Sequence, residues 1–182
     1  MTLEDLTIAV PDRLFAAAES LHVQGTYDVG KLQAGPDTYT FEQPVAWEAD
    51  ITNTGEALLV AGVAKGRAKV ACSRCLEDAF YDLEGNVEGY FLIPGEDGQL
   101  PEEDDEQDFE VLGSDQTIDF EPLICSALLL EAPVLPLCKD DCKGLCFTCG
   151  ANLNEGPCGC QSKEDAVDEM NPFAVLKNLK FD

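Results

Sequence analysis

Apolar and polar residues alternate along several stretches in the first half of the chain, a pattern typical of strands that bury one face. Residues 22–30 alternate modestly and could form one strand. Residues 44–72 alternate more strongly, but the turn-prone sequence NTGE and the sequence KGR interrupt them, so they predict two or three strands. Residues 79–93 are rich in aromatic and β-branched side chains and predict a further strand. We therefore expect an antiparallel sheet at the centre of the fold.

A long apolar stretch in the second half predicts a helix at residues 119–132. Asp119 is a possible N-cap, Pro122 suits the first turn, and Pro133 follows the last residue. Apolar side chains lie on nearly all sides of this helix, so we expect it to be buried against the sheet.

The C-terminal tail predicts a short amphipathic helix. Asn171 can cap it, Pro172 suits the first helical position, and Phe173 begins an apolar stripe. Such a helix either packs on the body of the same chain or fits a groove of a partner protein.

These elements predict an α+β fold, with an antiparallel β-sheet or small open barrel, a buried helix and a C-terminal cysteine-rich zinc module. We expect a β-rich body at residues 1–137, which includes an acidic loop at 95–113 and the helix at 119–132. A zinc-binding knuckle module at 138–161 and the helical tail at 162–182 complete the chain.

The charge distribution limits the kinds of partner. The 36 acidic residues exceed the 11 lysines and arginines, and the net charge of −25 disfavours non-specific binding to phosphate backbones. Residues Gly95–Glu110 hold nine acids and no base, which predicts a solvated loop or an acidic arm for a basic partner. Arg74, Lys139 and Lys143 lie near cysteines, so any contact with RNA is expected to be local.

The N-terminus and the apolar stretches indicate a cytoplasmic protein. Glu4 and Asp5 lie where a secretory signal would carry basic residues. The apolar stretch at Leu123–Leu130 is too short to cross a membrane. Thiols in the cytoplasm are normally reduced, so a disulfide framework is disfavoured.

Eight of the nine cysteines occur as close pairs. The ninth, Cys125, lies in the predicted helix and is most simply a small buried apolar residue. Structural zinc binds four ligands tetrahedrally, typically as two close pairs, so eight thiols suit two zinc ions. The pairs are Cys72 with Cys75, Cys138 with Cys142, Cys146 with Cys149, and Cys158 with Cys160.

The most local partition places the last two pairs on one zinc ion and the first two pairs on another. The second of these sites would tie the strand region to the segment after the helix across roughly sixty residues, a long closure that strongly constrains the unfolded chain. A single zinc in the C-terminal cluster, with Cys72 and Cys75 left free, stays an alternative.

Other chemistries receive less support from the sequence. CSRC has the spacing of a catalytic dithiol, and Arg74 would lower a thiol pKa, but the motif lies between predicted strands and does not open a helix. A hydrolytic zinc site usually employs histidine, and the single histidine, His22, is far from the cysteines in sequence. Neither an enzyme nor a small-molecule substrate is indicated.

Several segments together are similar to one family. CSRCLE, PLICSALLLEAPVLPLCKDDCKGLCFTCGANLN, CGC and NPFAVLKNLK resemble the YceD family of bacteria and plastids, from about Lys69 to the C-terminus. The resemblance implies a non-enzymatic factor in large ribosomal subunit biogenesis and 23S rRNA accumulation. The positions that share the resemblance are Cys72, Cys75, the C-terminal cysteines, Asn171, Pro172 and Phe173.

Two modes of action are compatible with this resemblance. Zinc would fix the hairpins that carry Arg74, Lys139 and Lys143, and a small basic face could then contact rRNA. Alternatively, the acidic arm would shield a basic large-subunit ribosomal protein before assembly. A thiol redox protein, or a redox-switched zinc protein that uses Cys72 and Cys75, is the alternative function.

Overall fold

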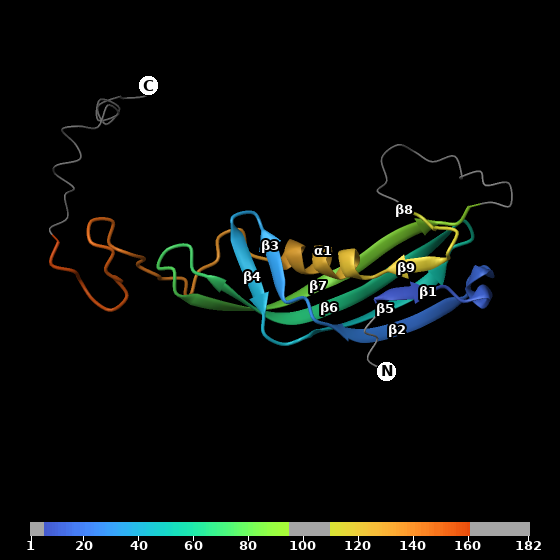
Figure 1. Ribbon diagram of the computed structural model, residues 1–182, viewed down its shortest axis with the longest axis horizontal. Coiled ribbons are helices and arrows are strands. Elements are labelled where there is room, and N and C mark those ends of the chain that lie inside the picture. Colours follow the sequence, from blue (N-terminus) through green and yellow to red (C-terminus); the bar gives the residue numbers. More distant parts are fainter. Residues whose placement is uncertain (1–5, 95–109, 161–182) are drawn as a thin grey trace, which may run out of the picture.

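A long β-hairpin forms the centre of the sheet in the computed structural model, which describes residues 6–94 and 110–160 (Figure 1). Strand β6 (Ala57–Ala71) pairs antiparallel with β7 (Asp78–Leu92) from one end to the other. Burial alternates along most of both strands, so one face of the hairpin packs on the core while the other faces solvent. The strand predicted at 79–93 is confirmed to within one residue at each end.

The other strands extend this sheet on both sides of the hairpin. Strand β5 pairs with one half of β6 and β4 with the other half, while β2 pairs with β5 and β3 with β4. Because β2 and β3 stand at the two ends of this strand order, the described strands form an open sheet without barrel closure. The bounds are β1 Thr7–Ala9, η1 Asp12–Phe15, β2 Ser20–Tyr27, β3 Lys31–Ala34, β4 Asp37–Phe41, β5 Val45–Asn53, β8 Glu110–Val111 and β9 Thr117–Asp119.

Two strand pairs lie outside this path. Strands β1 and β9 form a separate two-stranded antiparallel sheet. Strand β8 pairs in parallel with the end of β7, where Phe91 lies opposite Glu110 and Leu92 opposite Val111. The chain therefore leaves the sheet after β7 and returns to the same edge at β8.

The prediction that KGR interrupts a strand is wrong, because β6 continues through it. Lys65 points outward and forms an ion pair with Glu84 of β7 at 2.7 Å, and Arg67 points to the same side. Gly66 faces inward, where a Cβ atom would come within 2.7 Å of Val45 Cγ2. The glycine therefore relieves crowding in the core and does not end the strand.

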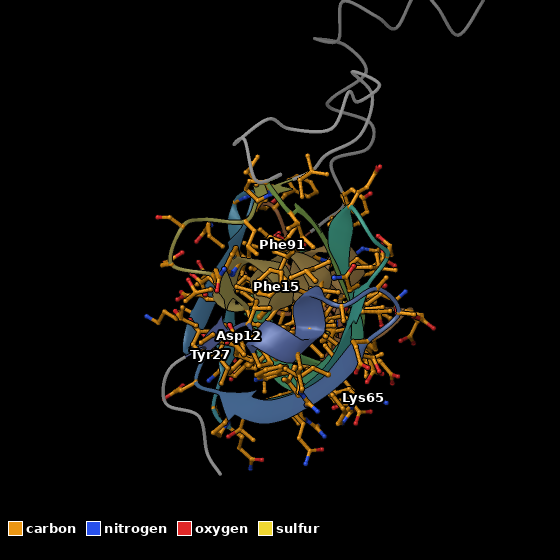
Figure 2. The ribbon with its side chains drawn as sticks, turned by 90° about the vertical axis from the view of Figure 1, so that its right-hand side faces the viewer. Asp12, Phe15, Tyr27, Lys65 and Phe91 are labelled. Atoms are coloured by element: carbon orange, nitrogen blue, oxygen red, sulfur yellow. The ribbon has the colours of Figure 1, made fainter. Side chains whose placement is uncertain are left out.

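Helix α1 (Glu121–Glu131) lies inside the curve of the sheet (Figure 2). The backbone N–H of Glu121 donates to Asp119 Oδ1 at 3.0 Å, and Pro122 occupies the first turn. Phe120, and not the predicted Asp119, occupies the N-cap position, and the helix begins two residues later than predicted. The Asp119 side chain still accepts from one of the free donors at the helix start.

Helix α1 packs against the sheet as expected, but only one of its faces is buried. Ile124 and Leu128 are fully buried, whereas Leu130 is 84% exposed. The buried face approaches β7 so closely at Gly85 that a Cβ atom there would collide with the backbone of Ala127. The sheet covers a single side of the helix, because an open sheet encloses its helix only in part.

The core is centred on an aromatic pair between sheet and helix. Trp47 of β5 stacks on Phe120, directly before α1, with ring centroids 4.8 Å apart and an angle of 24° between the planes. Both side chains are almost completely buried. This stack joins the middle of the sheet to the start of the helix.

Some predicted segments lie mainly or wholly outside the described residues. These are most of the acidic loop at 95–113 and the tail at 162–182, which includes Asn171, Pro172 and Phe173. Of the helices in the described ranges, none has the length and apolar character needed to cross a bilayer.

Gly85→Ala is expected to lower the free energy of unfolding by about 1–3 kcal/mol, because the added methyl group forces α1 away from β7. Urea denaturation monitored by circular dichroism measures the change. The neighbouring Asn86→Ala, at an exposed position of the same strand, is the matched control and should shift stability by less than about 0.5 kcal/mol. Equal stability of Gly85→Ala and the natural protein would contradict the close approach of the helix.

Candidate metal centre

The tip of the β6–β7 hairpin carries the first cysteine pair. Cys72 directly follows β6, and its backbone N–H donates to the carbonyl of Glu77 at 2.8 Å. The N–H of Leu76 donates back to the carbonyl of Cys72 at 2.9 Å, and Leu76 adopts a φ of 64°. This positive φ, which is uncommon for leucine, folds the turn so that both thiols face inward.

Two tyrosines hold the segment that brings in the second cysteine pair. Tyr81 of β7 donates its hydroxyl to the carbonyl of Leu137 and accepts from the N–H of the same residue, both at 2.7 Å. The hydroxyl of Tyr39 of β4 donates to the carbonyl of Pro133 at 2.9 Å. The segment after α1 is thereby fixed against the sheet beside the hairpin tip. The sequence analysis missed both tyrosines, since no local pattern marks them.

Four thiols converge where the hairpin tip meets this segment. Cys75 Sγ lies 3.5 Å from Cys138 Sγ, and Cys72 Sγ lies 3.8 Å from Cys142 Sγ. All four sulfurs lie within 4.8 Å of one another, and we call this group the inner cluster. A disulfide needs about 2.05 Å, whereas a tetrahedral zinc ion with Zn–S bonds of about 2.3 Å separates its sulfurs by about 3.8 Å. The spacing therefore fits a four-thiolate metal site.

A second group of four thiols forms entirely within the cysteine-rich segment. Cys146, Cys149, Cys158 and Cys160 also have sulfurs within 4.8 Å of one another, and we call them the outer cluster. Gly150 adopts a φ of 73° and donates its N–H to the carbonyl of Cys146 at 2.7 Å, which folds the first pair into a knuckle. The structure thus brings together the two sets of four that the local partition predicts.

The two clusters differ in exposure. In the inner cluster Cys72, Cys75 and Cys142 are buried and Cys138 is half-buried. In the outer cluster only Cys146 is buried, and Cys149 is exposed. Solvent and solutes therefore reach the outer cluster more readily.

One thiol in each cluster ionises readily. Burial alone would raise the pKa of Cys72, but hydrogen bonds from the backbone N–H groups of Cys75 and Arg74 outweigh it and lower the pKa to about 6. Backbone N–H groups of Cys149 and Thr148 likewise lower the pKa of Cys146 to about 6. These donors stabilise thiolates, the form that binds metal ions.

Other thiols in the same clusters resist ionisation. Burial and the neighbouring sulfur of Cys75 raise the pKa of Cys138 to about 12. The hydrogen bond with Cys149 raises the pKa of Cys160 to about 12. Crowded sulfurs cannot all carry charge without a cation among them, which a divalent metal ion would supply.

Asn154 connects the two clusters, although the sequence analysis did not single it out. It lies between the two pairs of the outer cluster in sequence, yet its side-chain Nδ2 donates to Cys142 Sγ of the inner cluster at 3.3 Å. Its Oδ1 accepts from the N–H of Lys143 at 2.9 Å. A hydrogen bond to a ligating sulfur orients the ligand and stabilises its charge.

Arg74 forms a second connection between the clusters. Its Nη1 donates to the carbonyl of Cys142 at 2.9 Å, and its own carbonyl accepts from the N–H of Leu145 at 3.1 Å. Gly144, with a φ of 74°, packs against Arg74, and a Cβ atom there would lie 3.0 Å from its carbonyl oxygen. These hydrogen bonds and this packing therefore hold the hairpin tip in direct contact with the start of the outer knuckle.

The three predicted binding cations do not form a freely available basic face. Besides the bond of Arg74 to Cys142, Lys139 lies 3.9 Å from Asp141 in an exposed ion pair. Lys143 has no ion pair among the described residues, but Asp140 and Asp141 precede it closely in the chain.

The open sheet and the two four-thiol clusters define a class of small proteins with closed, cysteine-only sites that could hold metal ions. Residues 60–180 match the family described as large ribosomal RNA subunit accumulation protein YceD. The chain belongs to this family, and the matched range contains all eight clustered cysteines.

Relatives come from bacteria and from plants. An uncharacterized protein of Mycobacterium leprae is 31% identical over 60% of this chain and 49% of its own length. An uncharacterized protein of Mycobacterium tuberculosis is 33% identical over 81% of this chain and 67% of its own length. The large ribosomal RNA subunit accumulation protein YCED homolog 1, chloroplastic, of Zea mays is 28% identical over 94% of this chain and 65% of its own length.

The chain thus spans about half to two thirds of the length of these relatives. No solved structure matches it at a significant level.

Metal bound at the two clusters is expected to leave in a fixed order. Because Cys149 is exposed while most of the inner cluster is buried, a chelator should remove metal from the outer cluster first. Native mass spectrometry during chelation should then show a one-metal intermediate. Metal release is expected to have a fast phase from the outer cluster and a slow phase from the inner cluster. The double variant Cys158→Ser/Cys160→Ser should lack the fast phase and keep the slow one. A fast phase that persists in this variant would contradict the assignment.

Asn154→Ala is expected to weaken metal binding at the inner cluster about tenfold, because the donor to Cys142 Sγ is lost. Competition with a chromophoric chelator measures the change. The matched control is Asn86→Ala, which removes an amide from an exposed strand position away from the cysteines. An affinity of Asn154→Ala equal to that of the control would exclude this role.

Proposed function

We propose that the protein is a non-enzymatic, zinc-binding factor that supports biogenesis of the large ribosomal subunit in the cytoplasm. The observation that carries this proposal is the family match over residues 60–180, because the matched range includes both cysteine clusters. The printed name of the maize relative, which refers to accumulation of large-subunit ribosomal RNA, supports the same role.

Zinc is the metal that suits the donor set. Four cysteine sulfurs in a tetrahedral arrangement are a typical ligand set for structural zinc, and such a site leaves no open position for a substrate. The inner cluster would join the hairpin tip to the segment after α1, and the outer cluster would hold the knuckle. The role of the eight cysteines is thus to shape a docking module.

The charges favour a basic ribosomal protein over rRNA as the direct partner. Acidic residues outnumber basic ones 36 to 11 in the chain, so the protein repels phosphate groups at long range. Of the cations near the clusters, Arg74 is bonded to a backbone carbonyl and Lys139 is paired with Asp141. A strongly acidic protein attracts a basic protein at long range, and this charge complementarity favours a basic partner.

Thiol redox activity at Cys72 and Cys75 receives less support. Cys72 is fully buried and Cys75 is 4% exposed, so an external substrate has little access to either sulfur. Each sulfur also lies close to a cysteine of the other pair, Cys72 at 3.8 Å from Cys142 and Cys75 at 3.5 Å from Cys138, as a site shared by four thiols requires.

The proposal predicts that cells depleted of the protein accumulate less large-subunit rRNA, and that the natural chain restores it. Cys72→Ser/Cys75→Ser should fail to restore it, because the inner cluster loses two ligands. Cys125→Ser is the matched control, since Cys125 belongs to neither cluster. Gradient sedimentation of ribosomal subunits and elemental analysis measure the two effects.

Two zinc ions per chain and one free thiol are expected for protein purified under reducing conditions. Normal subunit levels without the protein would refute the role in biogenesis. Purified protein without zinc, with Cys72 and Cys75 cycling between oxidised and reduced forms, would favour the redox alternative.

A further inference from the structure

Apolar side chains stay exposed at the cysteine-rich end of the molecule. Of the eight large apolar side chains that are exposed in the described part of the chain, five lie at this end, and Val134 is 98% exposed. Single exposed leucines are ordinary, but a group of apolar side chains on neighbouring segments marks an interaction surface. We call this group the end patch, and its members are Leu76, Leu130, Val134, Leu135 and Phe147.

The segments that carry the end patch are in direct contact with one another (Figure 1). The N–H of Ser73 donates to the carbonyl of Pro136 at 2.8 Å, which places the segment after α1 beside the hairpin tip and Leu76. The outer knuckle contacts the same tip, because Asn152 Nδ2 donates to Glu77 Oε1 at 2.8 Å. The exposed apolar side chains therefore gather at one end of the molecule.

The backbone under the most exposed part of the end patch is fixed. Val134 and Leu135 lie between two hydrogen-bonded carbonyls, that of Pro133, which accepts from Tyr39, and that of Pro136. Because both sides are held, these side chains are kept away from the core, and their exposure is a property of the fold. A surface of this kind is already ordered, so a segment that covers it loses less conformational entropy.

The C-terminal tail starts next to the end patch. The described residues end at Cys160, whose Sγ lies within 4.8 Å of Cys146 Sγ, and Phe147 follows Cys146 in the chain. Residues 161–172, which connect Cys160 to the predicted tail helix, span up to about 40 Å when fully extended. A segment tethered this closely acts at an effective concentration of about millimolar, so it competes well with a separate partner.

The side chains of the predicted tail helix suit such a surface. Phe173, Leu176 and Leu179 recur at helical spacing and would form one apolar stripe. Lys177 directly follows Leu176, and Lys180 directly follows Leu179. Both lysines would therefore border the stripe on the predicted helix.

Acidic side chains next to the end patch are free to pair with lysines. Glu131 directly follows Leu130 and is exposed, and Asp140 is exposed in the segment after α1. Neither carboxylate has a hydrogen bond or an ion pair within residues 6–94 and 110–160. An apolar stripe bordered by lysines therefore matches this surface in both polarity and charge.

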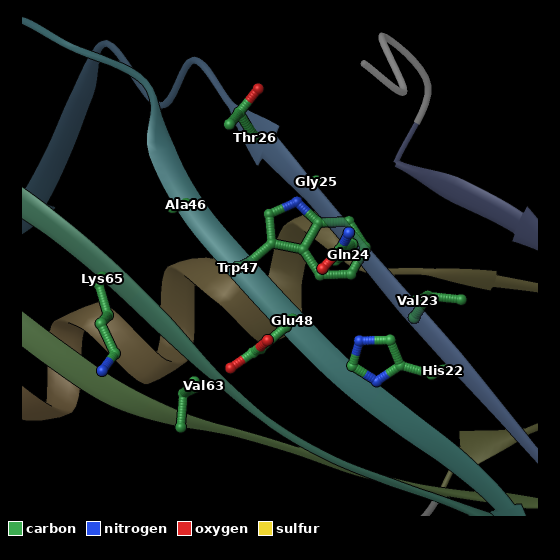
Figure 3. A pocket seen from close by; sticks show the side chains of 10 residues that line it. All are labelled: His22, Val23, Gln24, Gly25, Thr26, Ala46, Trp47, Glu48, Val63 and Lys65. Carbon is green, nitrogen blue, oxygen red and sulfur yellow. The ribbon is translucent and has the colours of Figure 1, made fainter. Parts of the chain in front are cut away.

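The sheet carries a broad hollow that could compete for the tail (Figure 3). It has a volume of about 740 Å³, and Gln24, Glu48 and Lys65 are among the side chains that line it. Because such polar and charged groups need water or polar partners, an apolar stripe laid over them would leave them unsatisfied. The end patch is therefore the better match for the stripe.

We propose that the C-terminal tail folds back as an amphipathic helix and packs on the end patch of the same chain. The apolar stripe covers Val134 and Leu135, while the bordering lysines approach Glu131 and Asp140. This contact ties the end of the outer knuckle to the segment after α1 independently of the thiol clusters. The inference does not rest on the proposed function, because it concerns contacts within one chain.

Hydrogen–deuterium exchange of the tail amides in the purified full chain tests this contact. Val134→Ser/Leu135→Ser removes two side chains that lie outside the core, so the fold is retained, and exchange at residues 173–180 should become at least about tenfold faster. The matched control, Leu59→Ser/Val111→Ser, removes the same two types of side chain at exposed positions of the sheet and should leave this exchange unchanged. Circular dichroism verifies that both variants are folded.

Photo-crosslinking identifies what the tail contacts. Benzoylphenylalanine in place of Phe173, in a mixture of isotopically light and heavy chains, should form links to the end patch of the same chain. Links between light and heavy chains would assign the surface to a second copy. Links in cells to another protein, with none inside the purified chain, would assign the tail to a partner. Either result, or equal exchange rates in the natural chain and Val134→Ser/Leu135→Ser, would overturn the inference.

Discussion

The convergence of four thiols from two distant parts of the chain is the constraint on which the rest of the structure depends. Cys75 and Cys138 are 63 positions apart in sequence, yet their sulfurs lie 3.5 Å apart. Residues 132–160 contain no helix or regular strand, so little secondary structure orders them. The hydroxyl of Tyr81 fixes the backbone of Leu137 and so positions Cys138 near the hairpin tip. A metal ion bound by the four sulfurs would hold the two parts of the chain together.

The outer cluster depends on the inner one through backbone and amide contacts. Asn154 donates to Cys142, and Leu145 donates to the carbonyl of Arg74, so the knuckle is seated on the tip of the β6–β7 hairpin. The cysteines of the outer cluster are closer together in sequence, so the cluster costs less chain entropy to assemble. They are also more exposed, so a metal ion bound there would be removed more easily. The inner cluster sets where the module stands relative to the sheet.

The spacing of the cysteines was sufficient to predict the two sets of four. Each close pair can be recognised locally in the sequence, and four pairs can be combined two by two in only a few ways. Alternation also located the main strands. The contacts that hold the module were not predictable: Tyr39 and Asn154 act across long sequence separations, and no local pattern marks them. The sequence KGR was wrongly predicted to interrupt a strand, and nothing in the pattern indicated which side of α1 stays exposed. The crowding at Gly66 and the open side of the sheet are properties of the assembled fold.

The parallel pairing of β8 with the end of β7 has a consequence for how the family can diverge. Since the chain departs after Leu92 and rejoins the same edge at Glu110, both attachment points are fixed by the sheet. The cost of closing a loop grows only slowly with its length, so insertions or deletions between these points leave the core register unchanged. The same edge is therefore a natural place to introduce an affinity tag or a fluorescent domain without disturbing the cysteine-rich end.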